Sequence, residues 1–240
     1  MTGLGTIVNG AAIFVGGMIG HTIGKALKKE MQDSLNMACG VSVLFIGIAG
    51  AMEGMLSIQN LQLSSGKSMM VTLCLVLGTI IGELLGIEHA FERFGEWLKQ
   101  KSGNGSDASF AGAFVTASLT VSIGAMAIVG AIQDGLQGDP STLFVKSVLD
   151  FIIILVMASS MGKGTAFSAI PVLVFEGSIT LLAQLVAPIM TDAAMAYLSL
   201  IGSILIFCIG VNLVWGKMIK VANMLPAVLF AILAAYLPWF

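Results

Sequence analysis

Long apolar runs separated by short polar connections dominate the pattern of the chain. Crossing a hydrocarbon layer about 30 Å thick takes a helix of about 20 apolar residues, because only helices or closed barrels satisfy their backbone groups there. Eight runs approach this length, at residues 3–24, 37–56, 68–88, 109–133, 143–162, 167–188, 195–214 and 224–239. The pattern therefore predicts an all-α, polytopic integral membrane protein with about eight transmembrane helices, in which residues 1–240 form a single transmembrane domain.

The longest connection, residues 88–108, has two parts of different character. Its first part places four apolar side chains on one helical face and charged side chains opposite, namely Phe91, Phe94, Trp97 and Leu98 against Glu92, Arg93, Glu96 and Lys99. This distribution is typical of a helix that lies on a membrane surface. Residues 102–109, SGNGSDAS, have the composition of a flexible linker. We therefore predict a cytoplasmic interfacial helix and a flexible loop.

Glycines at every fourth position mark two of the runs, as Gly16, Gly20 and Gly24 in the first and Gly78, Gly82 and Gly86 in the third. The recurrence indicates a duplicated two-helix hairpin, with repeats at residues 1–60 and 68–137 that cross the membrane in the same direction. Small residues four apart let membrane helices approach closely, so we interpret both glycine ridges as packing surfaces first and as pathway linings second. The same ridges would also serve a homo-oligomer.

Composition excludes several classes of protein. The chain is 57% hydrophobic and 10% charged, with a mean hydropathy of +0.99, which is too apolar for a soluble domain of this size. Eleven basic and 13 acidic residues provide no basic face for nucleic acid, so the lipid bilayer is the expected partner. Hydrolase, zincin and Walker motifs are absent, and the three cysteines are isolated in apolar runs. We therefore expect neither an enzyme nor a bound metal or cofactor.

The distribution of basic residues predicts the orientation. Nine of them lie in the odd-numbered connections, and only Lys67 and Lys146 lie in the even-numbered ones. Positive residues near span ends stay in the cytoplasm. With eight spans, both termini of the protein are then expected to face outward, away from the cytoplasm.

Ionisable residues within the runs are candidates for function, because a charge costs a few kcal/mol inside hydrocarbon. Glu83 lies within the glycine ridge of the third run, without a lysine within four residues, and Glu176 lies in the middle of the sixth run. Lys146 and Asp150 are four residues apart and can meet on one helical face, either as a structural ion pair or as a gate.

Other candidates lie nearer the ends of the runs. The dipeptide Gln133-Asp134 closes the fourth run, where Asp134 fits an interfacial carboxylate as well as it fits a pathway residue. Asn9 in the first run adds an amide. On this interpretation residues 122–150 form an outward mouth between two spans, and a solute would meet Asp134 early and Glu83 late.

The chain resembles the YqgA/YdfK family of bacterial membrane proteins over nearly its whole length. The resemblance is carried by GTIVNGAAIFVGGMIG at 5–20, GTIIGE at 78–83, GAMAIVGAIQDGLQGDPSTLFVKSVLDF at 124–151 and NMLPAVLFA at 223–231. It implies a multi-span inner-membrane protein of unestablished biochemical role, for which an ion channel or pump has been suggested. The polar residues at matching positions are Asn9, Glu83, Asp134, Asp139, Lys146, Asp150 and Asn223, whereas related sequences can hold an amide in place of Glu176.

The leading hypothesis is a membrane transporter or channel for a small solute, with a cation as the favoured solute. The residues expected along its pathway are Asn9, Glu83, Gln133, Asp134, Lys146, Asp150 and Glu176. It rests on acids without matching bases and on glycine-interrupted helices. The alternative is a scaffold or sensor that transports nothing and forms an oligomer through its glycine-rich helix faces. A dry, closed core would favour the alternative, and a polar cleft that reaches Asp134 would favour transport.

Overall fold

The computed structural model describes residues 2–59, 62–103, 107, 109–122 and 125–237. The first half contains α1 (Leu4–Ala26), α2 (Lys29–Met55), the strands β1 (Leu56–Gln59) and β2 (Gln62–Ser65), α3 (Ser68–Leu85), α4 (Ile87–Lys101) and α5 (Phe110–Ser122). The second half contains α6 (Ala125–Gln137), α7 (Ser141–Met161), the 3-10 helix η1 (Lys163–Ser168), α8 (Ala169–Leu181), α9 (Ala183–Val186), η2 (Ala187–Ile189), α10 (Asp192–Trp215), α11 (Val221–Met224) and α12 (Pro226–Ala234). The antiparallel β1–β2 hairpin was not expected from the sequence.

Six segments of the described chain are long and apolar enough to cross a membrane: α1, α2, α3, α7, η1 together with α8, and α10. The protein is therefore an all-α polytopic membrane protein, as predicted. The fourth expected span consists of α5 and α6, which are bent by 64° relative to each other and adjoin residues 123–124, outside the described residues. Counting this pair as one span gives seven.

The eighth expected span, 224–239, is shorter in the structure. Residues Val221–Ala234 form a short apolar segment made of α11 and α12, and residues 238–240 lie outside the described part. Pro226 opens α12 and has no N–H to continue the hydrogen bonds of α11, so the two helices are separate elements. The predicted count of eight spans is therefore not confirmed.

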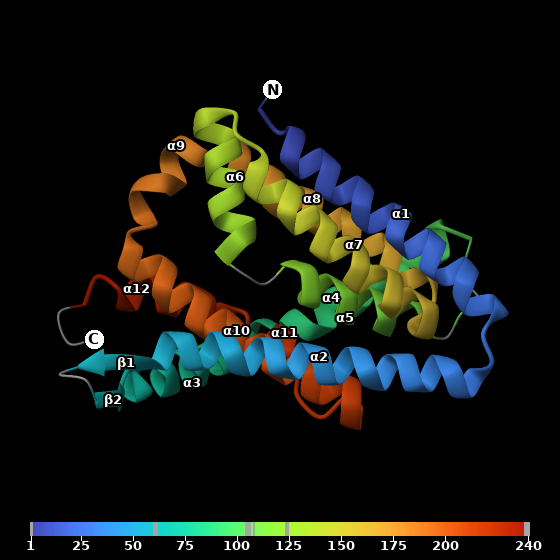
Figure 1. The fold of residues 1–240 in the computed structure, drawn as a ribbon, viewed down its shortest axis with the longest axis horizontal. Coiled ribbons are helices and arrows are strands. Elements are labelled where there is room, and N and C mark those ends of the chain that lie inside the picture. The colour runs from blue at the N-terminus through green and yellow to red at the C-terminus, as the bar shows by residue number, and fades with distance from the viewer. Residues whose placement is uncertain (1, 60–61, 104–106, 108, 123–124, 238–240) are drawn as a thin grey trace.

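Two groups of helices enclose α5 (Figure 1). In one group α1 packs along α7 and against α8, and in the other α2 packs along α10 while α3 packs against α11 and α12. Between them α5 contacts α4, η1, α7, α8 and α10. Most of the buried side chains of α5 are apolar, including Phe110 and Phe114, which are fully buried.

Glycines set the closeness of these helix pairs. A Cβ atom added at Gly20 would lie 2.1 Å from the carbonyl oxygen of Leu155 on α7, and one added at Gly82 would lie 1.8 Å from that of Asn223 on α11. Gly16, Gly24 and Gly78 similarly face backbone atoms of a neighbouring helix. Backbone contact of this kind requires glycine.

Gly86 differs from the other glycines of the two ridges. It adopts φ +61° after the end of α3, and an added Cβ would have no neighbour within 4 Å. Its role is the left-handed turn into α4 rather than helix packing. The two ridges also pack on different helices. The ridge of α1 packs on α7, and the ridge of α3 packs on α11 and α12. The duplicated hairpin at residues 1–60 and 68–137 therefore stays a prediction.

The expected interfacial segment, 88–108, coincides with α4 over most of its length. Phe94 stacks on Trp97 with 5.7 Å between ring centroids and also meets Phe114 of α5 edge-on. Leu98 is buried. The apolar face of α4 thus packs partly against the protein itself. Residues 104–106 and 108 of the expected loop lie outside the described residues.

Candidate functional site

Four polar side chains from three helices meet inside the first group of helices. They are Asn9 of α1, Lys146 and Asp150 of α7, and Glu176 of α8, and we call them the central polar cluster. Asn9 and Glu176 are 0% exposed, and Lys146 and Asp150 are 6% and 5% exposed. The cluster is therefore closed off from solvent.

Hydrogen bonds join all four members of the cluster. The Asn9 amide donates from Nδ2 to Asp150 Oδ2 at 3.1 Å and to Glu176 Oε1 at 2.9 Å. The Lys146 ammonium forms an ion pair with Asp150 and lies 3.6 Å from Glu176 Oε1. Asn9 thus bridges two carboxyl groups that belong to different helices.

Lys146 also binds the last turn of α5, next to the interruption between α5 and α6. Its Nζ donates to the carbonyl oxygen of Val121 at 2.8 Å, in the last turn of α5. Carbonyl groups in the last turn of a helix carry partial negative charge and lack partners within the helix. A positive charge is therefore already held at the place where this span breaks.

Local sequence explains why the cluster assembles. Lys146 and Asp150 lie one turn apart on α7, so both side chains project from the same helix face. Gly16 faces the backbone of Phe151, which draws α1 onto α7 beside Asp150. Gly10 faces the side chain of Leu173, with only 2.4 Å available to a Cβ atom, which draws α1 onto α8 beside Glu176. Small residues next to the polar ones therefore position Asn9 between its partners.

Asp134 binds the start of α1. Its Oδ1 accepts a hydrogen bond from the backbone N–H of Gly3 at 3.1 Å, and its Oδ2 accepts one from Gly5 at 2.9 Å. The first amides of a helix lack partners and carry partial positive charge, so a carboxylate stabilises them. Asp134 is 0% exposed, so its carboxylate is covered by the protein.

We expect Asp134→Asn to destabilise the protein, because the amide would turn an N–H group toward one of the two α1 donors. Leaving a buried donor unpaired costs about 1–3 kcal/mol. The melting temperature in detergent measures the loss. Glu53→Gln is the matched control, since Glu53 is exposed near the end of α2. Equal melting temperatures for the two variants would contradict this role of Asp134.

A buried hydroxyl pair lies between Asp134 and the central polar cluster. Thr6 of α1 and Thr180 of α8 are hydrogen-bonded through their hydroxyl groups, with 3.2 Å between the oxygens. Thr6 lies about one turn from Asn9, and Thr180 lies about one turn from Glu176. Polar groups therefore recur along α1 from its first residues to Asn9. This pair was not predicted from the sequence, because a single threonine in a span usually bonds to its own helix.

Two other predicted residues lie apart from the cluster. Gln133 accepts a hydrogen bond from Thr142 at 2.6 Å and thus links α6 to α7. Glu83 was expected to be buried without a basic partner, but it is exposed and pairs with Lys220 at 3.0 Å. The structure does not bring Glu83 to the other candidate residues.

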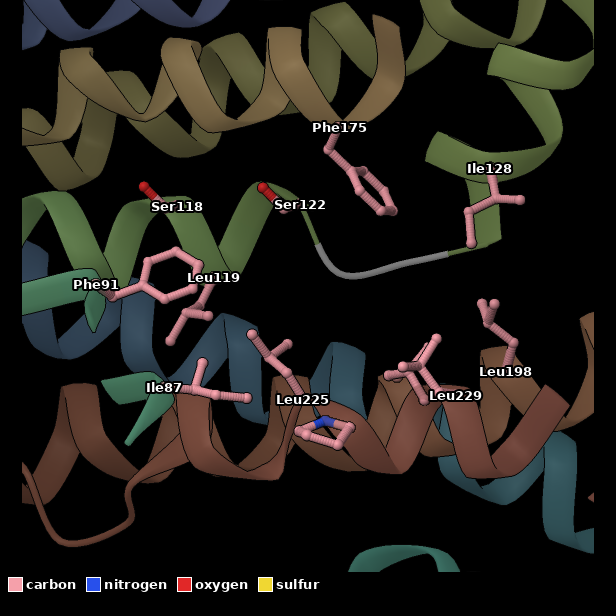
Figure 2. A pocket seen from close by; sticks show the side chains of 13 residues that line it. Ile87, Phe91, Ser118, Leu119, Ser122, Ile128, Phe175, Leu198, Leu225 and Leu229 are labelled. Carbon is pink, nitrogen blue, oxygen red and sulfur yellow. The ribbon is translucent and has the colours of Figure 1, made fainter. Parts of the chain in front are cut away.

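An apolar cavity of about 310 Å³ lies between the two groups of helices (Figure 2). Phe175 and Ile128 line one side of it, and Leu198, Leu225 and Leu229 line the opposite side. Phe175 immediately precedes Glu176 in the chain, and Ser122 in the cavity wall immediately follows Val121. The hydroxyl oxygen of Ser122 is buried and has no hydrogen-bond partner among the described residues.

A second, polar cavity of about 600 Å³ shares Leu119 with the apolar one. We call it the basal vestibule, and its polar lining comprises Asn36, Glu88, Glu92, Glu96, Ser109, Thr116, Asn212 and Lys217. Lys217 bridges Glu88, at 2.8 Å, and Glu92. Its ammonium holds the pKa of Glu92 below the usual range. No local pattern predicted this site, because Lys217 joins α4 from far along the chain.

Glu88 is the buried member of the vestibule. Its Oε2 accepts the N–H of Ala222 at 3.3 Å, and its own N–H donates to Asn223 Oδ1 at 2.7 Å. These bonds fix the start of α4 against α11. Across the described residues, no three His, Cys, Asp or Glu side chains gather in an arrangement that would hold a metal ion.

The apolar spans and the buried charged cluster define the class of the protein, a polytopic α-helical membrane protein with an ionisable core. The chain belongs to the family described as "Protein of unknown function (DUF554)", whose model matches residues 4–236. It is 29% identical over 243 residues to "Uncharacterized protein YqgA" of Escherichia coli (strain K12), covering 99% of each chain.

It is also 29% identical over 225 residues to "Uncharacterized membrane protein YdfK" of Bacillus subtilis (strain 168), covering 94% of this chain and 92% of the relative. The resemblance found in the sequence motifs is thus confirmed. No solved structure matches the chain.

Proposed function

We propose that the protein is a transporter that carries a small cation across the bacterial cytoplasmic membrane, with the central polar cluster as its binding site. One observation carries the proposal. Within the central polar cluster, two carboxyl groups and one ammonium group are closed off from solvent in the core of the membrane domain. Buried ionisable groups are costly in a membrane and typically mark ion or substrate pathways.

The surroundings of the cluster support a route on both sides of it. Toward the start of α1, Thr6 with Thr180 and then Asp134 continue the polar groups. Toward the other end, the apolar cavity and the basal vestibule follow one another and share Leu119, which is 6% exposed. An apolar constriction between polar compartments blocks ions until it opens. A closed core is also what the scaffold or sensor alternative predicts. On the transport proposal it corresponds to the closed state of a carrier rather than to an open channel.

The interruption between α5 and α6 supports the same mechanism. Secondary transporters commonly bind cations at discontinuous spans, where the ends of half-helices offer carbonyl oxygens. Here the carbonyl of Val121 holds the Lys146 ammonium.

The proposed orientation follows the positive-inside rule. Lys217 and Lys220 lie at the same end of α10 as the basal vestibule, and most other basic residues fall in the same set of connections. We therefore assign the vestibule to the cytoplasmic side and the start of α1, with Asp134, to the outer side.

Cation flux into proteoliposomes tests the proposal. Liposomes that contain the purified protein are expected to accumulate sodium or potassium ions faster than protein-free liposomes. Glu176→Gln should reduce the rate to the protein-free level, because it removes the uncompensated carboxylate of the cluster. Glu83→Gln is the matched control, since Glu83 is an exposed acid of another span and should leave the rate unchanged.

Either of two results would reject transport through the cluster. Flux that survives in folded Glu176→Gln would show that the ion passes elsewhere. Absence of flux in the wild-type protein, over a range of cations and membrane potentials, would favour the scaffold or sensor alternative instead.

A further inference from the structure

The central polar cluster contains one more acidic than basic group. Lys146 forms its ion pair with Asp150, and its Nζ lies farther from Glu176, at 3.6 Å. One ammonium can neutralise only one of two ionised carboxylates. The second carboxylate, on the fully buried Glu176, needs another positive partner to remain ionised.

Two oxygen atoms of the cluster have no hydrogen-bond partner within the part of the chain that the structure describes. They are Oδ1 of Asn9 and Oε2 of Glu176, and both residues are 0% exposed. The orientation of the Asn9 amide follows from its neighbours. Its Nδ2 donates to two carboxylate oxygens, and the flipped amide would place an oxygen, which cannot donate, against the same two carboxylate oxygens. Each unpaired oxygen is bonded to the same carbon as one atom of the Asn9–Glu176 hydrogen bond, so both belong to groups that take part in this contact.

We propose that the cluster binds a single monovalent alkali cation through Glu176 Oε2 and Asn9 Oδ1. Oxygen atoms are the ligands that hard cations prefer. The positive charge of Lys146 determines the valence of the bound ion. With two carboxylates and one ammonium, one monovalent ion makes the cluster neutral, whereas a divalent ion leaves one excess positive charge. This inference rests on the proposed function and names its cargo.

Lys146 also distinguishes the site from one for calcium or magnesium. Such ions are typically bound by carboxylates, carbonyls and waters. The Lys146 Nζ touches Asp150 and lies near Glu176, so it would repel a divalent ion more strongly than a monovalent one. The ammonium thus excludes divalent ions from the cluster.

Equilibrium binding of radioactive sodium to the purified full-length protein in detergent tests the inference. We expect saturable binding of about one ion per chain, as the charge balance of the cluster requires. Lithium and potassium chlorides should compete more strongly than calcium or magnesium chlorides at equal concentration. Glu176→Gln should weaken sodium binding by more than about tenfold. At metal sites, the loss of a group that only supports a ligand already lowers the affinity by about that factor. Glu83→Gln should bind sodium as the wild type does.

A second variant tests the role of Lys146. Lys146→Gln leaves two uncompensated carboxylates, so calcium should become a stronger competitor relative to potassium than it is in the wild type. The wild-type competition series decides the question even if a variant fails to fold. Absence of saturable sodium binding, or stronger competition by calcium than by potassium in the wild type, would overturn the inference.

Binding and flux separate the inference from the proposed function. Sodium binding that depends on Glu176, together with absence of flux, would support the site and reject transport. Flux in the wild type together with unchanged sodium binding in Glu176→Gln would overturn the site and leave transport standing.

Discussion

Replacing Lys146 with methionine is expected to destabilise the protein severely. The side chain would keep a similar length and lose its charge, leaving the buried Asp150 and Glu176 carboxyl groups without an ammonium partner. Removing one member of a buried ion pair costs about 3–5 kcal/mol. The carbonyl of Val121 would lose its hydrogen bond as well. A fall in the melting temperature in detergent measures the effect.

Two comparisons show whether the loss comes from the cluster. Lys220→Met breaks the exposed pair with Glu83 and should leave the melting temperature nearly unchanged, because solvent screens that pair. The double variant Lys146→Met with Asp150→Asn should recover part of the lost stability, since one of the two unpaired acids is gone. A double variant less stable than Lys146→Met alone would contradict this account.

Sequence alone predicted where the membrane helices lie better than how they end. The first three runs agree with α1, α2 and α3 to within a few residues at most ends, because an apolar run of that length has no alternative to helix in a bilayer. The first residues of α2, from Lys29, were missed because they are polar, although they are good helix formers. Hydropathy also cannot distinguish one continuous span from two shorter helices that meet at an angle, as α5 and α6 do.

The candidate residues show the same contrast between local and distant information. The Lys146–Asp150 pair was evident from its spacing, and the structure adds Asn9 and Glu176 to it through contacts between helices. Glu83 was misjudged because its partner Lys220 lies 137 residues further along the chain. The partners of Asp134 are backbone amides, which leave no signature in the identity of the residues. Polarity therefore identified the candidates, while only packing determined their partners.

Gly20→Ala is the second change for which we expect a large effect. The new Cβ atom would lie 2.1 Å from the carbonyl oxygen of Leu155 and 2.9 Å from the side chain of Ala158, so α1 and α7 would have to separate. Overpacking typically costs about 1–3 kcal/mol, and a collision with backbone lies at the upper end because a carbonyl cannot rotate away. Separation of the two helices would also move Asn9 away from Asp150, so cation flux should fall together with the melting temperature.

Gly112→Ala is the matched control for this prediction. Gly112 is also a helical glycine, in α5, but an added Cβ atom would have no described residue within 4 Å. Alanine favours helix over glycine by about 1 kcal/mol, so this variant should be as stable as the wild type or slightly more stable. Normal stability and flux in Gly20→Ala would mean that α1 can shift along α7 without disturbing the cluster. The close approach of α1 to α7 would then not be what holds Asn9 in place, and the positioning would have to come from α8 through Gly10 and Leu173.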